Sequence, residues 1–526
     1  MKVVTLMLVL MVSAVVAQRK PFADAELITA NQLRAYLEFM ASDELQGRDT
    51  PSLGLDIAAK FIASHLARWG VEPGGEEGTY FQKIEVTQTT VDPASKLTLK
   101  GKDYFYGKDF LLTAKRDLSV DAEVCFAGHG WYVPSRNINP YEGLNIRNKV
   151  VVVTDLVPTG LDFKEIGRFG VDYMTPATYA TKHGAVAVVY VPNYRSLVSW
   201  DKAAEFAVER GTMTIGSENS TLVPQITLSL RLLTALFEDE VVSAGFLFSS
   251  EGNSKSGIKP FYLSSDKVLR LNIITRMKKL STSNVIGIVR GSDPKLKNEY
   301  VALGAHYDHV GVASWQEGDN IYNGADDNAS GTVALMAIAE AFARGYRPRR
   351  SLLFVWHTAE EKGLLGSAYF VQHPTVPLDS IIAQLNIDMI GRSRQNGDTT
   401  NLELSGPDEV YVIGARMLSS ELGELSEQVN NTFLRLKFNY KYDDPDDPNR
   451  FFYRSDHYNY AKQGIPTIFY FTGVHEDYHR PTDHASKIDF EKMTKITKTI
   501  YATALELAMR PKRPAVDRDS SNLAFP

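Results

Sequence analysis

The densest group of histidine, aspartate and glutamate residues in the sequence lies between His306 and Glu361. This stretch contains the motifs GAHYDHVG, NGADDNASG and HTAEEKGLLGS, and each adjoins a run of residues typical of a buried strand or helix. Charged groups beside buried segments destabilise a fold unless a partner binds them. The pattern therefore predicts that these side chains hold a metal cluster.

Residues of the same types follow other apolar runs, so ligand-type side chains lie at the ends of five separate segments. They are His306 and Asp308 after VALGA, Asp326 and Asp327 at the start of an alanine-rich helix, Glu360 and Glu361 after SLLFVWHTA, Asp388 after AQLNI, and His475 and His479 after TIFYFTG. In a parallel sheet, ligand sites lie beyond the carboxyl ends of the strands. We therefore expect these segments to converge on one site, whose imidazole and carboxylate ligands suit zinc or cobalt.

The elements that must position these side chains form an alternation of strands and helices. The apolar runs YVALGA, SLLFVW, IIAQLNI and IPTIFYF are continuous rather than alternating, as in strands buried on both faces. Predicted helices lie between them, and two amphipathic helices precede them within residues 28–48 and 50–70. The sequence therefore predicts an α/β fold with a mostly parallel central sheet flanked by helices.

The chain is long enough for more than one folding unit, because its 526 residues exceed the roughly 250–300 at which single cores stop growing. Residues 117–261 contain short apolar strands and few clustered residues of ligand type. We interpret them as a smaller α/β insert in a discontinuous catalytic domain formed by residues 18–116 and 262–510. Residues 511–526 are rich in proline and charge, which predicts a flexible tail.

Charge and the N-terminal segment limit the partners and the location of the protein. A net charge of −6 without a lysine- or arginine-rich block argues against a nucleic-acid partner. Residues 1–17 are typical of a cleavable signal peptide, and their apolar run is shorter than the ~20 residues of a bilayer span. We therefore expect a secreted or periplasmic protein with no membrane span after signal cleavage. Cys125 is the only cysteine, so the chain forms no internal disulfide.

Several motifs in a fixed order carry a specific resemblance. GAHYDH, GADDNASG, HTAEEKGLLGS, LNIDMIG and DYHRPTD resemble the motifs of the co-catalytic dizinc aminopeptidase family, which shares its fold with glutamate carboxypeptidase. The match covers the N-terminal helices, including SDELQGR, and residues 281 to about 508, and the insert resembles the protease-associated domain that many members carry. The resemblance implies a zinc exopeptidase with two Zn²⁺ per chain and a peptide substrate.

The resemblance also implies roles for individual residues. It gives the metal ligands as His306, Asp326 (the bridge between the two zincs), Glu361, Asp388 and His479. Glu360 would be the general base for the water that bridges the zincs, and Asp308 would orient His306. The peptide bond between Asp326 and Asp327 would be cis.

Other polar residues near these motifs have two open interpretations. Ser455, Asp456 and His457 in YRSDHYNYAKQGIP resemble a family segment that lines the substrate cleft, so they are candidates for substrate contact or for a local structural role. We interpret His309 and His357 as structural residues.

The predicted function is that of an exported dizinc exopeptidase, acting as an aminopeptidase. A carboxypeptidase or dipeptidase on the same scaffold is the first alternative, and it needs a cationic pocket from Arg392, Arg394, Arg450 or Arg454. A glutaminyl cyclase with one zinc and a non-catalytic receptor-like protein are further alternatives, which the intact ligand set disfavours.

Overall fold

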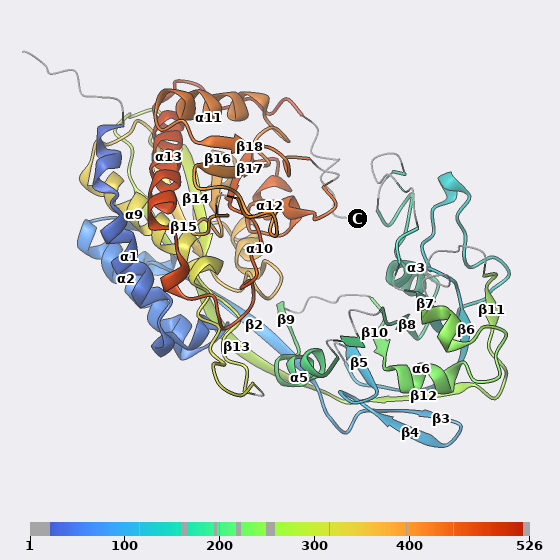
Figure 1. Cartoon of the computed structure of the whole chain (residues 1–526). Coiled ribbons are helices and arrows are strands. Elements are labelled where there is room, and N and C mark those ends of the chain that lie inside the picture. Colours follow the sequence, from blue (N-terminus) through green and yellow to red (C-terminus); the bar gives the residue numbers. More distant parts are fainter. Residues whose placement is uncertain are drawn as a thin grey trace, which may run out of the picture.

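The computed structural model of the chain shows two units that lie side by side (Figure 1). It describes residues 22–518 except 115, 155, 159–160, 162–165, 168, 194–196, 199, 217–221, 249–257, 315, 396 and 445–446. The predicted signal peptide, residues 1–17, lies outside the described residues. The larger unit contains the predicted ligand motifs, and the smaller unit contains most of the predicted insert.

A mixed ten-stranded sheet, counted over the described residues, forms the centre of the larger unit. In spatial order it contains β18 (Lys437–Asn439), β17 (Glu409–Ile413), β19 (Thr467–Phe471), β16 (Ile381–Ile387), β14 (Tyr300–His306), β15 (Ser351–His357), β13 (Thr275–Val289), β2 (Phe81–Val91) and β9 (Thr212–Ile215), with β1 (Glu72–Pro73) beside β13. The central strands β19, β16, β14 and β15 are parallel, whereas β13, β2 and β9 continue the sheet antiparallel. The predicted α/β class is confirmed, with the parallel arrangement confined to these central strands and the β17–β18 pair.

Helices cover both faces of this sheet. Every residue of the central parallel strands is therefore buried. One face packs against α1 (Ala30–Met40), α2 (Leu53–Trp69), α9 (Gly331–Arg344), α11 (Ser420–Thr432) and α13 (Phe490–Met509). The other face packs against α10 (Leu365–Gln372) and α12 (His457–Ala461). The alanine-rich sequence is helix α9, as expected, and it is buried along most of its length.

The smaller unit is built on a second sheet whose limits differ from the predicted ones. Its strands are β3 (Lys96–Leu99), β4 (Lys102–Phe105), β5 (Phe110–Thr113), β6 (Leu118–Phe126), β7 (Val150–Thr154), β8 (Ala187–Val191), β10 (Gln225–Leu228), β11 (Phe261–Tyr262) and β12 (Val268–Ile273). The predicted limits at residues 117 and 261 are therefore too narrow, because β12 pairs antiparallel with both β3 and β6 and draws the flanking segments into this sheet. Cys125 is buried in this unit as a free thiol.

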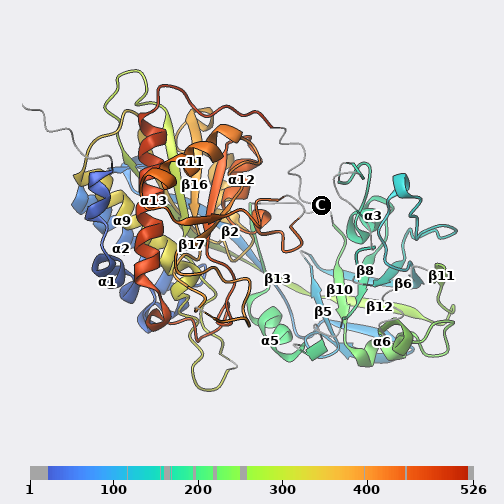
Figure 2. The same ribbon diagram turned by 45° about the horizontal axis from the view of Figure 1, so that its top comes forward.

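Two long antiparallel strands, β2 and β13, run from one unit into the other (Figure 2). A second connection is made by α5 (Trp200–Arg210) and β9, since β9 pairs with β2 and so joins the larger sheet. The Arg210 guanidinium donates a hydrogen bond to the Val312 carbonyl at 3.0 Å. This segment of the smaller unit therefore contacts a loop close to the ligand motifs.

Short helices complete the two units. They are α3 (Pro176–Lys182), α6 (Leu230–Leu236), α7 (Ala244–Phe248), η1 (Ala23–Leu27), η2 (Asp43–Arg48), η3 (Glu76–Gly78), η4 (Pro134–Arg136), η5 (Ala325–Ser330), η6 (Leu378–Ser380), η7 (Phe451–Tyr453) and η8 (Ala485–Lys487). No helix within the described residues combines the length and the apolar character that a membrane crossing requires.

The described part of the predicted flexible tail is hydrogen-bonded to helix α11. The Ala515 amide donates to the Glu421 carboxylate at 3.0 Å, and the Ser420 amide donates to the Asp517 carboxylate at 2.9 Å. Ala515 and Asp517 thus have partners on this helix, which the proline and charge content alone did not indicate.

Candidate metal centre

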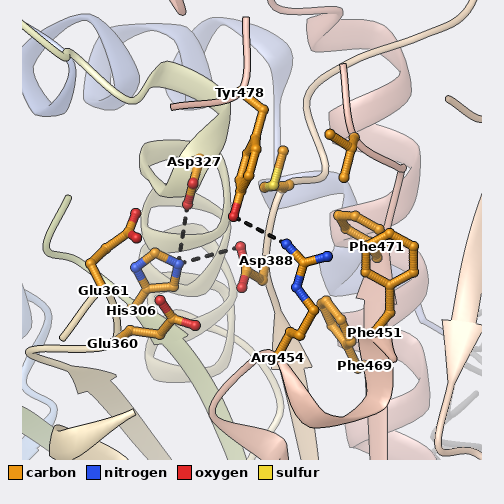
Figure 3. Close-up of a pocket in the computed structure, with 12 residues that line it drawn as sticks. His306, Asp327, Glu360, Glu361, Asp388, Phe451, Arg454, Phe469, Phe471 and Tyr478 are labelled. Carbon is orange, nitrogen blue, oxygen red and sulfur yellow. Dashed lines mark hydrogen bonds and ion pairs between the residues drawn. The ribbon is translucent and has the colours of Figure 1, made fainter. Parts of the chain in front are cut away.

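The predicted ligand segments meet at the carboxyl ends of the central parallel strands. His306 is the last residue of β14, Asp388 directly follows β16, and the Glu360–Glu361 pair lies in the loop after β15. Figure 3 shows their side chains turned toward one another around a pocket. The expected convergence on one edge of the sheet is therefore present in the structure.

Two groups of ligand-type side chains share one aspartate. The first contains His306, Asp327 and Asp388, the second contains His309, Asp327, Glu361 and His479, and the ligand atoms within each group lie within 4.8 Å of one another. Asp327 Oδ1 lies 3.3 Å from His306 Nε2, whereas Asp327 Oδ2 lies 3.1 Å from His479 Nε2. The two oxygens of one buried carboxylate thus face different groups, which is the arrangement of a bridging ligand.

The prediction that Asp326 is the bridge is wrong. Its Oδ1 accepts a hydrogen bond from the Gly391 amide at 2.6 Å, and its Oδ2 lies 3.3 Å from His475 Nε2, outside both groups. The cis peptide bond likewise joins Asp327 to Asn328, one residue later than expected. Successive side chains of this turn point in different directions. The two neighbouring aspartates therefore make different contacts, although their chemistry is identical.

A buried network behind the bridge fixes its backbone. Asp483 Oδ2 accepts hydrogen bonds from the Asp326 and Asp327 amides at 2.9 and 3.2 Å. Asp483 in turn lies against Arg392, whose guanidinium donates to Asp483 Oδ1 at 3.4 Å and to Asp477 Oδ2 at 2.7 Å. Asp477 and Asp483, which belong to the DYHRPTD motif, were not predicted as site residues. Arg392, which directly follows LNIDMIG, was considered only as a cation for a substrate pocket.

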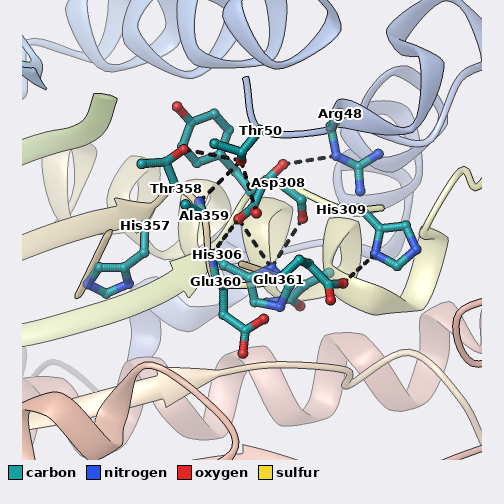
Figure 4. A network of polar contacts seen from close by, with 12 residues as sticks. Arg48, Thr50, His306, Asp308, His309, His357, Thr358, Ala359, Glu360 and Glu361 are labelled. Atoms are coloured by element: carbon teal, nitrogen blue, oxygen red, sulfur yellow. Dashed lines mark hydrogen bonds and ion pairs between the residues drawn. The ribbon is translucent and has the colours of Figure 1, made fainter. Parts of the chain in front are cut away.

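Asp308 acts on two neighbours, as Figure 4 shows. Its carboxylate accepts hydrogen bonds from the Glu360 amide and from Thr50 Oγ1, both at 3.1 Å. His306 Nδ1 lies 3.2 Å from the Asp308 carbonyl oxygen and 3.8 Å from the carboxylate. Asp308 therefore touches His306 mainly through its main chain, while its side chain holds the backbone that carries Glu360.

The adjacent glutamates have different surroundings. Glu361 Oε2 lies 3.1 Å from His479 Nε2, and Glu361 Oε1 lies 2.8 Å from His309 Nδ1. Burial raises the pKa of Glu361, but these imidazoles outweigh it and lower the pKa to about 2. Glu360 belongs to neither ligand group, and burial together with the nearby Glu361 and Asp388 carboxylates raises its pKa well above the usual range. One glutamate is thus placed to bind a cation and the other to exchange a proton.

A fully buried arginine lies beneath the site, unassigned by the sequence analysis. Arg48 donates hydrogen bonds to the carbonyls of Tyr307, Asn323 and Gly324 at 3.0, 2.7 and 3.1 Å, and also to that of Met40. Burial lowers its pKa to about 10, and the site carboxylates oppose this shift. This cation ties together the loops that precede the ligands, and its sequence signal is the SDELQGR motif.

Ser455, Asp456 and His457 lie behind the pocket wall, which favours the local structural role over substrate contact for these three residues. All three are at most 1% exposed. Ser455 Oγ donates to Asp388 Oδ2 at 2.7 Å, and Asp456 Oδ2 lies 3.3 Å from His357 Nδ1. His457 is surrounded by aromatic rings, and burial lowers its pKa to about 3. These residues support the site from within the protein.

The pocket beside the ligand groups has an apolar wall and a single arginine among its lining residues (Figure 3). Besides the acids and His306, it is lined by Met389, Phe451, Arg454, Phe469, Phe471, Val474 and Tyr478. Of the arginines considered for a cationic pocket, Arg454 is the one in this lining, whereas Arg392 is buried against Asp477 and Asp483.

The donor set itself fits zinc. Asp388 Oδ1 and His479 Nε2 are buried atoms that make no hydrogen bond of good geometry among the described residues, although they lie 3.4 Å from His306 Nε2 and 3.1 Å from Glu361 Oε2. Buried polar atoms normally have partners, and imidazole nitrogen with carboxylate oxygen is the ligand mixture that zinc accepts. A metal ion in each group would satisfy both atoms.

Solved structures of aminopeptidases share this architecture. The fold is similar to an aminopeptidase from Aneurinibacillus sp. strain AM-1 with a TM-score of 0.58 and 17% identity, covering 94% of this chain and 98% of that one. A zinc aminopeptidase from Bacillus subtilis gives a TM-score of 0.53 and 19% identity, with the same shares covered. The fold of this chain is therefore similar to that of these two α/β proteins.

The sequence comparison leads to the family. The model of Peptidase family M28 matches residues 284–504, so this part of the chain is similar to that family. A probable leucine aminopeptidase 2 of Arthroderma benhamiae is 28% identical over 59% of this chain and 59% of its own length. Leucine aminopeptidase 2 of Arthroderma otae is 31% identical over 40% of this chain and 38% of its own length. The chain thus spans less than two thirds of these relatives, and its predicted family resemblance is confirmed.

Proposed function

We propose that the protein is a zinc aminopeptidase that removes the first residue from peptides. The observation that carries this proposal is the Asp327 carboxylate, whose two oxygens face two different sets of ligands. The leucine aminopeptidase names of the sequence relatives and the zinc aminopeptidase fold support it.

Two zinc ions are proposed, one for each ligand set. His306, Asp327 and Asp388 would hold one ion, and Asp327, Glu361 and His479 would hold the other. His309 would fix Glu361 through the 2.8 Å contact of its Nδ1. Bound zinc supplies a Lewis acid for the substrate carbonyl and lowers the pKa of a coordinated water.

Glu360 is proposed as the group that moves the proton. It lines the pocket without belonging to either ligand set, and Asp308 holds its backbone amide. Nearby divalent cations favour its carboxylate form, which offsets the rise in pKa caused by burial. Glu360 then accepts a proton from the attacking water and donates it to the leaving amine.

The pocket wall accounts for substrate placement. Met389, Phe469, Phe471 and Val474 offer an apolar surface for the side chain of the first residue. The carboxylates on the opposite side attract the free amine that an aminopeptidase selects. A carboxypeptidase or dipeptidase activity is the second candidate, because Arg454 provides one cation in this pocket.

The function is tested with leucine anilide and its N-acetylated form on protein whose zinc content has been measured. We expect turnover of the free-amine substrate alone, with about two zinc ions per chain. Glu360→Gln should keep the zinc and lose catalysis by at least ~100-fold, the usual scale of a general base. Glu38→Gln is the control, since Glu38 is an exposed glutamate on α1, away from the pocket lining. If the protein hydrolyses no free-amine substrate, the aminopeptidase assignment is wrong.

We further propose export, based on the signal-like sequence of residues 1–17. Expression of the full chain in a secreting host should give a mature protein that begins at Gln18. N-terminal sequencing of the secreted fraction checks this, and an unprocessed N-terminus in the cell fraction would contradict it.

A further inference from the structure

A positively charged side chain projects into the pocket next to the ligand groups. Arg454 follows η7, and its guanidinium lies 5.0 Å from the centroid of the Phe451 ring. Figure 3 shows it between Asp388 and the phenylalanine cluster, with its planar end toward the pocket. The ring supports the guanidinium from one face and leaves its edge available for hydrogen bonding.

This guanidinium has spare hydrogen-bonding capacity. Within the described part of the chain, its hydrogen-bonding contact is with Tyr478 Oη, at a long 3.5 Å. Arg392 differs, because Asp477 and Asp483 occupy its donors. An arginine offers five N–H donors in a fork that matches a carboxylate, so most donors of Arg454 are available to a ligand.

The other charged residues of the pocket are the acids and His306 of the metal site. Zinc ions bound to those acids would take up much of their negative charge, leaving Arg454 as the free cation of the pocket. The Tyr478 hydroxyl accepts from Arg454 and keeps its own proton available to a second acceptor. The two side chains therefore present convergent donors, which is how proteins bind an anion.

We propose that Arg454 and Tyr478 bind a carboxylate of the substrate and so determine specificity. This inference rests on the proposed peptidase function and names its preferred substrate class. The carboxylate has two possible sources, the side chain of aspartate or glutamate as the first residue, or the free C-terminus of a dipeptide. In either case the apolar wall contacts the carbon chain and the arginine–tyrosine pair holds the charged end.

Two pairs of substrates that differ only in charge test the proposal on the zinc-loaded full chain. Glutamyl anilide is compared with glutaminyl anilide, and Leu-Gly is compared with Leu-Gly amide. The wild-type protein should favour the charged member of at least one pair by about 10- to 100-fold in kcat/KM, the scale of a charge-assisted hydrogen bond. The first pair reports the side-chain source, and the second reports the C-terminal source.

Substitution of the arginine should remove this preference. Arg454→Gln should lower kcat/KM for the charged substrate by about the same factor and leave its neutral partner nearly unchanged. Arg454→Lys should recover part of the loss, because it restores the charge without the fork. Arg394→Gln is the matched control, since it removes an arginine that does not line the pocket. Equal losses for charged and neutral substrates, or no preference in the wild type, would overturn the proposal.

A binding measurement makes the test independent of turnover. If the side chain is the source, calorimetric titration should show tighter binding of glutamate than of glutamine, and Arg454→Gln should abolish the difference. Hydrolysis of neutral substrates without any charge preference refutes this inference alone. Absence of hydrolysis with every substrate refutes the proposed function, and the titration then decides whether the pocket still selects a carboxylate.

Discussion

At the scale of single residues, the site depends on which of two adjacent aspartates faces the ligand groups. Asp327 contacts both groups, whereas Asp326 contacts Gly391 and His475. Asp327→Asn should therefore lose most of the zinc and the activity, because one oxygen that a cation needs becomes an amide. Asp326→Asn should keep about two zinc ions, since its Oδ1 can still accept from Gly391. Metal analysis of both variants checks this, and the reverse outcome would restore Asp326 as the bridge.

His457 should make the fold sensitive to acid. Its pKa in the folded chain is about 3, because burial opposes its protonation, while the ordinary value is 6.5. Below pH 6.5 the unfolded chain binds the proton and the folded chain does not, so the free energy of unfolding falls as the pH decreases toward 3. This lost stability amounts to roughly a few kcal/mol by pH 4.

The prediction is tested with His457→Phe, which keeps an aromatic ring against Phe469. The variant should show a shallower decline in the free energy of unfolding between pH 7 and pH 4.5, measured by urea titration at several pH values. The difference at pH 7 sets the baseline for any change in packing. Parallel pH profiles for the two proteins would contradict the assignment.

At the scale of elements, the loop at residues 475–483 is attached to the sheet through Arg392. This loop carries His479 and also Asp483, which holds the backbone of the bridging aspartate. Arg392→Met would leave Asp477 and Asp483 buried without their cation, which costs about 3 kcal/mol in comparable buried pairs. We expect a lower melting temperature and about 10-fold weaker zinc binding.

Competition with a calibrated chelator measures the zinc affinity of this variant, and Arg394→Met serves as its control. Lys487 also contacts Asp477 at 2.6 Å, so part of the charge compensation remains. A variant with wild-type zinc affinity and melting temperature would show that the loop is held by other contacts.

At the scale of the whole molecule, the sequence predicted what depends on local pattern. Continuous apolar runs predicted the buried central strands, and the positions of His306 and Asp388 at strand ends predicted the convergence of the site. The role of Asp327 was not predictable, because adjacent aspartates are distinguished only by the turn of the backbone. Arg48 contributes through carbonyls far along the chain, a contact without a local pattern.

The predicted limits of the smaller unit were too narrow for a related reason. Pairing of β12 with β3 joins segments about 170 residues apart, so the edge of the second sheet is a tertiary property. Short apolar runs in the sequence predicted the parallel strands β7 and β8. They did not predict that the hairpin of β3 and β4 belongs to the smaller unit, because its alternating residues resemble those of the neighbouring strand β2.

Metal removal should destabilise the whole molecule, because the site joins segments from the entire larger unit. Without cations, the carboxylates of Asp327, Glu361 and Asp388 lie close together in a buried space, where like charges repel. A ligand present at about 100 times its Kd stabilises the folded state by about 2.7 kcal/mol. Treatment with a chelator should therefore lower the melting temperature by several degrees and abolish hydrolysis, and added zinc should restore both. The Asp327→Asn variant should show little response to the chelator, since it already lacks the metal. An equal drop in wild type and variant would mean that the chelator acts elsewhere on the chain.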